Sequence, residues 1–325
     1  MSGSGITVVT PPPPTAPSGR PPRRPRRVSG HRTSVPLVRP ARAPKDGRWW
    51  AGAAILTVSV LLLSLVAHAT VFSALQHYRA QTLSYNALRV SLAKAETPVG
   101  QLVETDRMAE IGTPVAYLEI PAIGLKEVVV EGTASDVLRG GPGHRRDSVM
   151  PGQSGVAVIL GRQSTYGGPF SQLNRLKPGD EITVTTGQGA STFTVFGLRR
   201  AGDPMPAALT GTQGRLELQT ADGLALFPSG VLHVDAQLSS AARQTPSRVM
   251  DYPALPIAER GMGQNPAGWF LAFFALVFFA AAGIGVWWLW RSWGRWQAWV
   301  IGVPVLIAFG VATADTVMNA LPNLL

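Results

Sequence analysis

The strongest constraint on the fold is a run of 24 residues without a charged side chain, Trp49–Phe72. A helix needs about 20 apolar residues to cross the hydrocarbon core of a bilayer. The apolar part of a cleaved signal peptide is shorter, roughly 7–15 residues, and does not follow so long a tail. We therefore expect an uncleaved transmembrane helix at residues 49–72.

A basic tail precedes this run. Before Trp49 the chain has ten Lys or Arg residues and a single acidic residue, Asp46, in a stretch rich in proline. Such a composition cannot form a core, so residues 1–48 are expected to be disordered. A basic segment beside a span favours the cytoplasmic side of the membrane. Residues 71–268 carry 17 charges of each sign, which argues against nucleic acid as a partner.

Two further apolar runs follow near the end of the chain. We predict transmembrane helices at residues 268–290 and 299–318, joined by a cytoplasmic loop at 291–298 that holds Arg291 and Arg295. The last span is interrupted by Pro304 and Asp315, and Asp315 is expected near its outer end. The lipid bilayer is then a partner of a multi-pass membrane protein whose central region is extracellular.

The central region is rich in short alternating patterns. Residues 73–112 are interpreted as a helical stalk, 113–240 as a β domain and 241–267 as a linker. The β domain has many short strands separated by Gly and Pro turns, which predicts an all-β fold closed into a barrel, with short helices. The candidate strands are Val115–Ile120, Glu127–Val130, Gly155–Leu160, Glu181–Thr185, Thr192–Phe196, Leu216–Thr220 and Val231–Leu238.

The order of several motifs in this region resembles the sortase family, the thiol transpeptidases of Gram-positive cell surfaces. The motifs are "YLEIPAIGLKEVVVEGT", "LRGGPGH", "MPGQSG" and "VILGRQSTYGGPFSQLNRLKPGDEITVTT". The nearest similarity is to the actinobacterial housekeeping-type, or class E-like, sortases. The resemblance implies a sortase-like closed β-barrel ectodomain, in addition to the three transmembrane helices.

The residues at the family's catalytic positions depart from the pattern. The resemblance places Arg162 where the family has its histidine and Ala221 where it has its cysteine. Val231 stands at the position of its arginine, or Gly230 with a slip of one residue. The chain contains no cysteine at all. The resemblance therefore implies a degenerate site with no catalytic residues.

This pattern supports a catalytically inactive protein. A transpeptidase needs a nucleophile that attacks and later leaves, and an alanine methyl group does neither. Our leading hypothesis is a membrane-anchored protein that binds a cell-surface protein or a peptide similar to a sorting signal. The candidate groove residues are Thr220, Asp222, Pro204, Met205 and Pro206. Strand alternation turns Thr220 away from Ala221, and Asp222 is expected in a turn.

Two alternatives remain open. One is an active transpeptidase or hydrolase with a displaced nucleophile, for which Ser164 and Thr165 are candidates if a His or Lys lies within reach. The other is a structural subunit of a membrane complex, packed through small residues in "AAAGIGV". His144 is expected to form a structural hydrogen bond, and His233 to be half-buried between strands. Neither a metal site nor a cofactor is predicted.

Overall fold

A computed structural model describes residue 10 and residues 47–103, 107–225 and 227–325. The chain divides into two units, Met1–Trp50 and Ala51–Leu325. The barrel and the candidate site lie in the second unit. The tail expected at residues 1–48 falls almost entirely outside the described residues.

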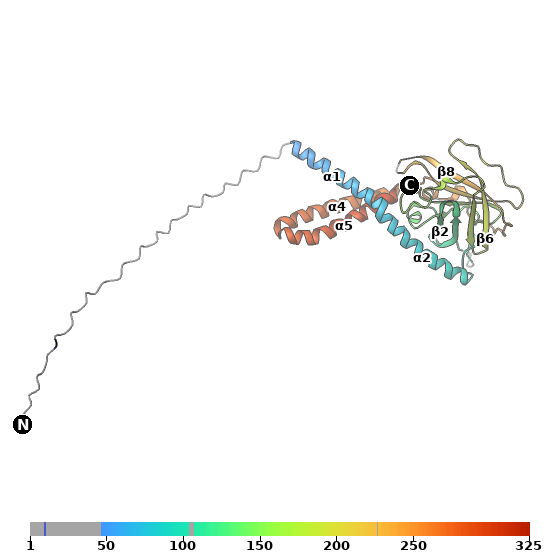
Figure 1. The fold of residues 1–325 in the computed structure, drawn as a ribbon, viewed down its shortest axis with the longest axis horizontal. Helices are drawn as coiled ribbons and strands as arrows, with labels where there is room; N and C mark the ends of the chain where they lie inside the picture. The colour runs from blue at the N-terminus through green and yellow to red at the C-terminus, as the bar shows by residue number, and fades with distance from the viewer. Residues whose placement is uncertain (1–9, 11–46, 104–106, 226) are drawn as a thin grey trace, which may run out of the picture. The chain divides into compact units, whose positions relative to one another are not determined.

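Within the described part of the second unit, eight strands form a closed barrel in the order β1-β2-β3-β4-β7-β8-β6-β5 (Figure 1). The barrel closes because β1 pairs with both β2 and β5. Most neighbouring strands are antiparallel, but the pairs β2–β3 and β4–β7 are parallel. The strands are β1 Pro114–Ile120, β2 Leu125–Glu131, β3 Gly143–His144, β4 Gly155–Leu160, β5 Glu181–Thr186, β6 Gly189–Arg199, β7 Gly214–Leu224 and β8 Phe227–Leu238.

The barrel interior is filled by apolar side chains from every strand except β3. On β7, Leu216 and Leu218 are fully buried in the main core, where they meet Val234 of β8 and Ile159 of β4. Successive residues of a strand point to opposite faces. Ala221 therefore lies on the outer face of β7, where it joins a second apolar cluster with Leu160. The predicted all-β barrel is thus confirmed.

The seven predicted strands are present, and the structure corrects two details. The short strand β3 carried no alternating pattern and was not predicted. The turn expected at residues 220–223 is wrong, because β7 continues to Leu224 and pairs with β8 along this stretch. A bulge between Asp222 and Gly223 accommodates the glycine, whose φ is +105°. Asp222 is therefore a strand residue.

A long helical stretch precedes the barrel. Helix α1 (Gly47–Ala67) continues through a π-helical turn, η1 (His68–Phe72), into α2 (Ser73–Ala93). The helix expected at residues 73–112 ends at Ala93, and it is not a free stalk. The Gln81 side chain donates to the carbonyl oxygens of Val128 and Gly140 at 3.1 and 2.8 Å, so α2 is fastened to β2.

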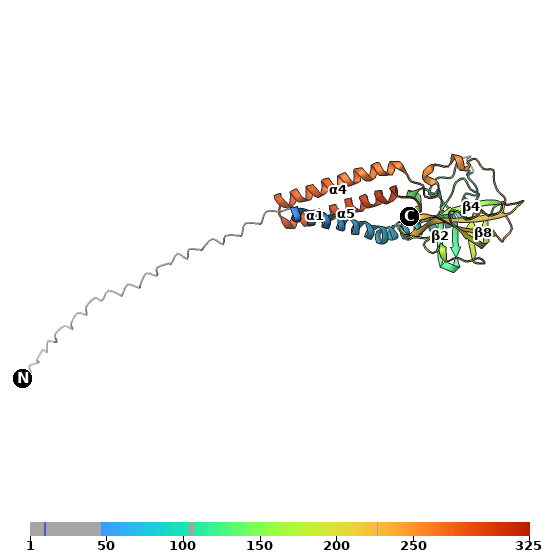
Figure 2. The same ribbon diagram turned by 90° about the horizontal axis from the view of Figure 1, so that it is seen from above.

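Helices α4 (Pro266–Ser292) and α5 (Arg295–Ala320) run side by side as a hairpin (Figures 1 and 2). Of the described helices, three are long and apolar enough to cross a membrane: Leu61–Ala93, Pro266–Ser292 and Trp296–Ala320. Pro304 lies inside α5 without ending it. The short helices are η2 Pro121–Ile123, α3 Ser135–Leu138, η3 Leu173–Arg175, η4 Tyr252–Ala254 and η5 Ile257–Glu259.

Candidate functional site

The fold brings together the three positions that the resemblance assigns to catalysis. Ala221 and Val231 pair across two strands, and Arg162 lies at the same end of the barrel. Ala221 on β7 lies opposite Val231 on β8. Arg162 follows β4, whose parallel pairing with β7 continues through a hydrogen bond of 3.0 Å from the Gly161 amide to the Gln219 carbonyl. The ends of β4 and β7 thus carry Arg162 and Ala221 to the same end of the barrel.

Ala221 lies in an apolar environment. Its exposure is 1%, and it packs in a cluster with Leu138, Leu160 and Leu324. Val231 is partly buried against the same cluster. Leu324 comes from the segment that follows α5, so a distant part of the chain covers this position.

Arg162 is fully buried. Its Nη2 atom donates to the backbone oxygen and the hydroxyl of Ser135, both at 2.7 Å. Its Nη1 atom donates to the Thr165 hydroxyl at 3.0 Å and to the carbonyl oxygen of Leu325 at 3.1 Å. The guanidinium also lies 4.8 Å from the centre of the Tyr166 ring. These contacts hold the side chain in one place, as the planar fork of an arginine allows.

The electrostatics of Arg162 do not suit proton transfer. Burial lowers the pKa of Arg162 to about 10, because desolvation disfavours the charged form. At neutral pH the group is still a cation that only donates hydrogen bonds. It can neither accept a proton from a nucleophile nor readily give one to a leaving group.

Thr220 and Asp222, the two residues of β7 proposed for the peptide groove, do not line an open groove. Thr220 is buried and lies opposite Leu232 of the main core, on the inward face of β7. It therefore does not line an outer groove, which corrects its inclusion there. Asp222 accepts a hydrogen bond of 2.9 Å from Arg200, so its carboxylate is engaged in an ion pair.

An open groove does lie on the outer face of β4 and β7, beside the loop at residues 200–213. Its lining includes Pro206 of that loop, whereas Pro204 and Met205 do not line it and Met205 is 75% exposed. The groove also carries five charged side chains, which the sequence patterns did not single out. We call it the basic groove; these residues are Arg145, Arg215, Arg248, Asp147 and Glu217.

The two acidic groups of the basic groove are already paired. Arg145 donates to the Asp147 carboxylate at 2.6 Å. Glu217 lies 2.6 Å from Nδ1 of His233 and 2.8 Å from Arg199. Burial raises the pKa of Glu217. Hydrogen bonds from His233 and Gln219 and the charge of Arg199 lower it by more, so the pKa falls to about 2. His233 is thus a cross-strand partner of Glu217, as well as half-buried.

The hydroxyl groups considered as displaced nucleophiles lack a base. Thr165 donates to the Leu325 carbonyl at 2.5 Å, and Ser164 donates to the Ala225 carbonyl at 3.2 Å. Among the described residues, neither hydroxyl forms a hydrogen bond with a histidine or a lysine.

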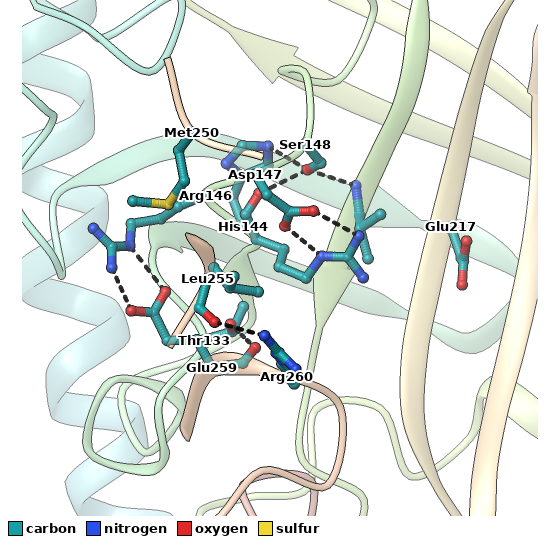
Figure 3. Close-up of polar contacts among 12 residues, drawn as sticks. Thr133, His144, Arg146, Asp147, Ser148, Glu217, Met250, Leu255, Glu259 and Arg260 are labelled. Carbon is teal, nitrogen blue, oxygen red and sulfur yellow. Dashed lines mark hydrogen bonds and ion pairs between the residues drawn. The ribbon is translucent and has the colours of Figure 1, made fainter. Parts of the chain in front are cut away.

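One serine does lie beside a histidine, and it was not predicted. The Ser148 hydroxyl is 3.1 Å from Nε2 of His144 (Figure 3). Nδ1 of the same ring is 2.9 Å from Glu131. However, the same Nε2 lies 2.9 Å from the Val149 carbonyl, which can only accept. Burial lowers the pKa of His144, but Glu131 and the two hydrogen bonds raise it more.

The hydrogen bonds of Ser148 agree with a charged histidine. Its hydroxyl donates to the Arg145 carbonyl at 2.8 Å and accepts from the Val158 amide at 3.1 Å. An imidazolium that donates to Glu131 and Val149 has no lone pair for the serine proton. The arrangement is therefore structural, as expected for His144. In the part of the chain that the structure describes, no three His, Asp or Glu side chains converge on a metal position.

Comparison with known proteins agrees with this fold. Residues 118–222 match the family model for the sortase domain. Sortase D of Bacillus subtilis is 34% identical over 86 residues, which are 26% of this chain and 42% of that protein. Residues 118–222 are therefore similar to the sortase domain, and the match to Sortase D spans less than half the length of that protein.

Solved structures of sortases are also similar. Sortase E from Streptomyces avermitilis is 29% identical and covers 47% of this chain and 100% of its own, with a TM-score of 0.36. The Clostridium perfringens Sortase D5 transpeptidase is 20% identical, with 50% and 98% covered and a TM-score of 0.40.

Proposed function

We propose that this chain is a catalytically inactive, membrane-anchored sortase-like protein of the outer cell surface, which acts by binding an extended peptide or a segment of a partner protein. The observation that carries the proposal is the alanine at residue 221. The resemblance assigns the nucleophile to this position, and the chain has no cysteine that could replace it. Loss of the nucleophile removes covalent catalysis.

The other two positions support the same view. Arg162 is a buried cation fixed by four hydrogen bonds, and Val231 carries no donor for an oxyanion. Acid–base catalysis and oxyanion stabilisation each need a polar group at the reacting atoms. Ala221 and Val231 have no polar side-chain atom, and the Nη atoms of Arg162 already donate to Ser135, Thr165 and Leu325.

The basic groove is the surface that we propose for the ligand. Among the described residues, Arg215 and Arg248 form no ion pair. Arg215 donates to the Ala207 carbonyl at 2.7 Å, which joins β7 to the loop that carries Pro206. The loop supplies apolar contact through Pro206 and Leu209, and the arginines favour acidic side chains. The ligand class is therefore an extended segment with both apolar and acidic residues.

Fluorescence anisotropy tests this proposal on the full chain in lipid nanodiscs. The probe is a labelled octapeptide of two prolines, two leucines and four glutamates, and its partner has four lysines in place of the glutamates. We expect the acidic probe to bind more tightly, and Arg215→Glu or Arg248→Glu to weaken it about fivefold to tenfold. The matched control is Arg175→Glu, because Arg175 is exposed and outside the groove.

Two results would contradict the proposal. Equal binding of both probes, unaffected by the groove variants, would show that the groove is not the binding surface. No binding at all would favour the structural-subunit hypothesis, in which the apolar helices make the contacts.

A further inference from the structure

A segment of the chain itself lies over Ala221. Residues Leu321–Leu325 follow α5, and we call them the docking segment. Leu324 is fully buried in the apolar cluster that contains Ala221, Leu138 and Leu160. The side chain of Leu324 therefore occupies space directly outside the position that the resemblance assigns to the nucleophile.

The backbone of the docking segment is held by the loop after β4. The Leu324 carbonyl accepts from the Gln163 amide at 2.9 Å. The Leu325 carbonyl accepts from Arg162 at 3.1 Å and from the Thr165 hydroxyl at 2.5 Å. Arg162 thus bridges two parts of the chain: one terminal nitrogen donates to the docking segment and the other donates to Ser135. A lysine would lack the planar guanidinium fork, whose two terminal nitrogens reach acceptors on both sides.

Asn323 provides specific polar contacts. Its side-chain amide lies 2.8 Å from the Thr133 carbonyl and 2.9 Å from the Arg260 carbonyl. Its backbone amide donates to the Gly263 carbonyl at 3.0 Å. Asn323 is fully buried, so these bonds satisfy groups that would otherwise be costly to remove from water.

The outer wall of this receptor is fixed independently. Arg146 forms a bidentate ion pair with Glu259, and the Thr133 hydroxyl donates to the Glu259 carbonyl at 2.5 Å (Figure 3). Arg260 donates to the Leu255 carbonyl at 3.2 Å. These bonds anchor the segment after η4 to the barrel, so the carbonyls of Arg260 and Gly263 are in place for Asn323.

We propose that the remnant of the catalytic site is a receptor for the docking segment. The segment closes the site to outside peptides and joins the end of helix α5 to the barrel. A second contact lies at the same junction, where the Tyr166 hydroxyl donates to Asp315 of α5 at 2.7 Å. The receptor adjoins the basic groove, because Val156 and Val158 belong to both. The proposal rests on the inactivity proposed above but does not depend on ligand binding in the groove.

A single introduced cysteine reports whether the site is closed. The chain has no native cysteine, so Ala221→Cys can be followed with a maleimide in the full chain in nanodiscs. The accessible control is Ala225→Cys, on the exposed end of the same hairpin, and the core control is Ala236→Cys inside the barrel. We expect Ala221→Cys to react about a hundredfold or more slowly than Ala225→Cys, because labelling requires local opening.

Release of the docking segment should expose the reporter. Leu324→Asp places an unpaired carboxylate in the apolar cluster, and Asn323→Ala removes the buried amide bonds. Each should raise labelling of Ala221→Cys about tenfold or more while Ala236→Cys stays protected. The matched control is Leu224→Asp, because Leu224 is 74% exposed and its change should have no effect. The peptide Leu-Pro-Asn-Leu-Leu should restore protection to a chain that ends at Ala320.

The proposal is overturned if Ala221→Cys labels as fast as Ala225→Cys in the intact chain. It is equally overturned if both release variants leave the reporter protected. If Leu324→Asp also exposes Ala236→Cys, the barrel has unfolded, and Asn323→Ala together with the peptide experiment then decides between the same two outcomes.

Discussion

The Nη1 atom of Arg162 lies 3.1 Å from the carbonyl oxygen of Leu325, a residue 163 positions further along the chain. The resemblance assigns a proton-transferring histidine to position 162. Here the position holds a buried cation that fixes backbone oxygens on both of its sides. One side is Ser135 of the barrel, and the other is the segment that follows helix α5.

Restoring the family residue at this position should therefore weaken the protein. In Arg162→His the shorter imidazole cannot reach both Ser135 and Leu325, so buried acceptors lose their donors. We expect a loss of about 2–3 kcal/mol in the free energy of unfolding. Denaturant unfolding of the nanodisc-embedded chain measures it. Arg175→His, at an exposed position, is the control, and equal stability of the two variants would contradict the packing described for Arg162.

The Glu217 cluster predicts loss of stability in acid. The folded pKa of Glu217 is about 2, below its ordinary value of 4.5. Its ionised form therefore contributes stability that is complete above pH 4.5 and is lost as the pH falls toward 2. A tenfold difference between the acid dissociation constants of Glu217 in the folded and unfolded states corresponds to about 1.4 kcal/mol. The shift therefore sets an upper bound of about 3.5 kcal/mol on this contribution. Unfolding curves between pH 2 and 6 should show this loss, and Glu217→Gln should flatten it. An unchanged slope in Glu217→Gln would assign the acid sensitivity to other groups.

The charge pattern predicts the topology. Reporter fusions after Gln264 and after Gly294 should lie on opposite sides of the membrane, because α4 separates them. Alkaline phosphatase, which is active only outside, should work at the first fusion and fail at the second. Activity at both sites, or at neither, would rule out the proposed orientation.

Much of the fold could be predicted from local pattern. Alternation along Leu216–Thr220 and Gly155–Leu160 reflects one buried face of each strand, so the barrel strands were recognisable. The last residues of β7 were not, because Ala221, Asp222 and Gly223 have turn chemistry in isolation. Their pairing with β8 outweighs that preference. Strand β3 could not be predicted either, because its two residues are too few to show an alternating pattern. It forms a strand through its pairing with neighbouring strands.

The candidate site was only partly predictable. The positions of Arg162 and Ala221 follow from the order of motifs, and Pro206, proposed for a peptide groove, lies in the lining of the basic groove. The basic residues of that groove lie far apart in sequence, from Arg145 to Arg248, so no local pattern groups them. The docking of Leu324 on Ala221 is likewise a long-range contact made by a short apolar segment. Only the folded chain brings such residues together.

Cleavage of a sorting-signal peptide by the purified full chain decides whether the sortase-like barrel is catalytically inactive. The measurement compares the native chain with Ala221→Cys and with the triple variant Arg162→His, Ala221→Cys, Val231→Arg. Catalytic groups act as a unit, so a lone thiol without its acid and oxyanion partner should give no turnover. We predict no cleavage product from the native chain or from Ala221→Cys above the rate in buffer. Turnover by the native chain would contradict the proposed inactivity, and its loss in Ser148→Ala, Ser164→Ala or Thr165→Ala would identify a displaced nucleophile.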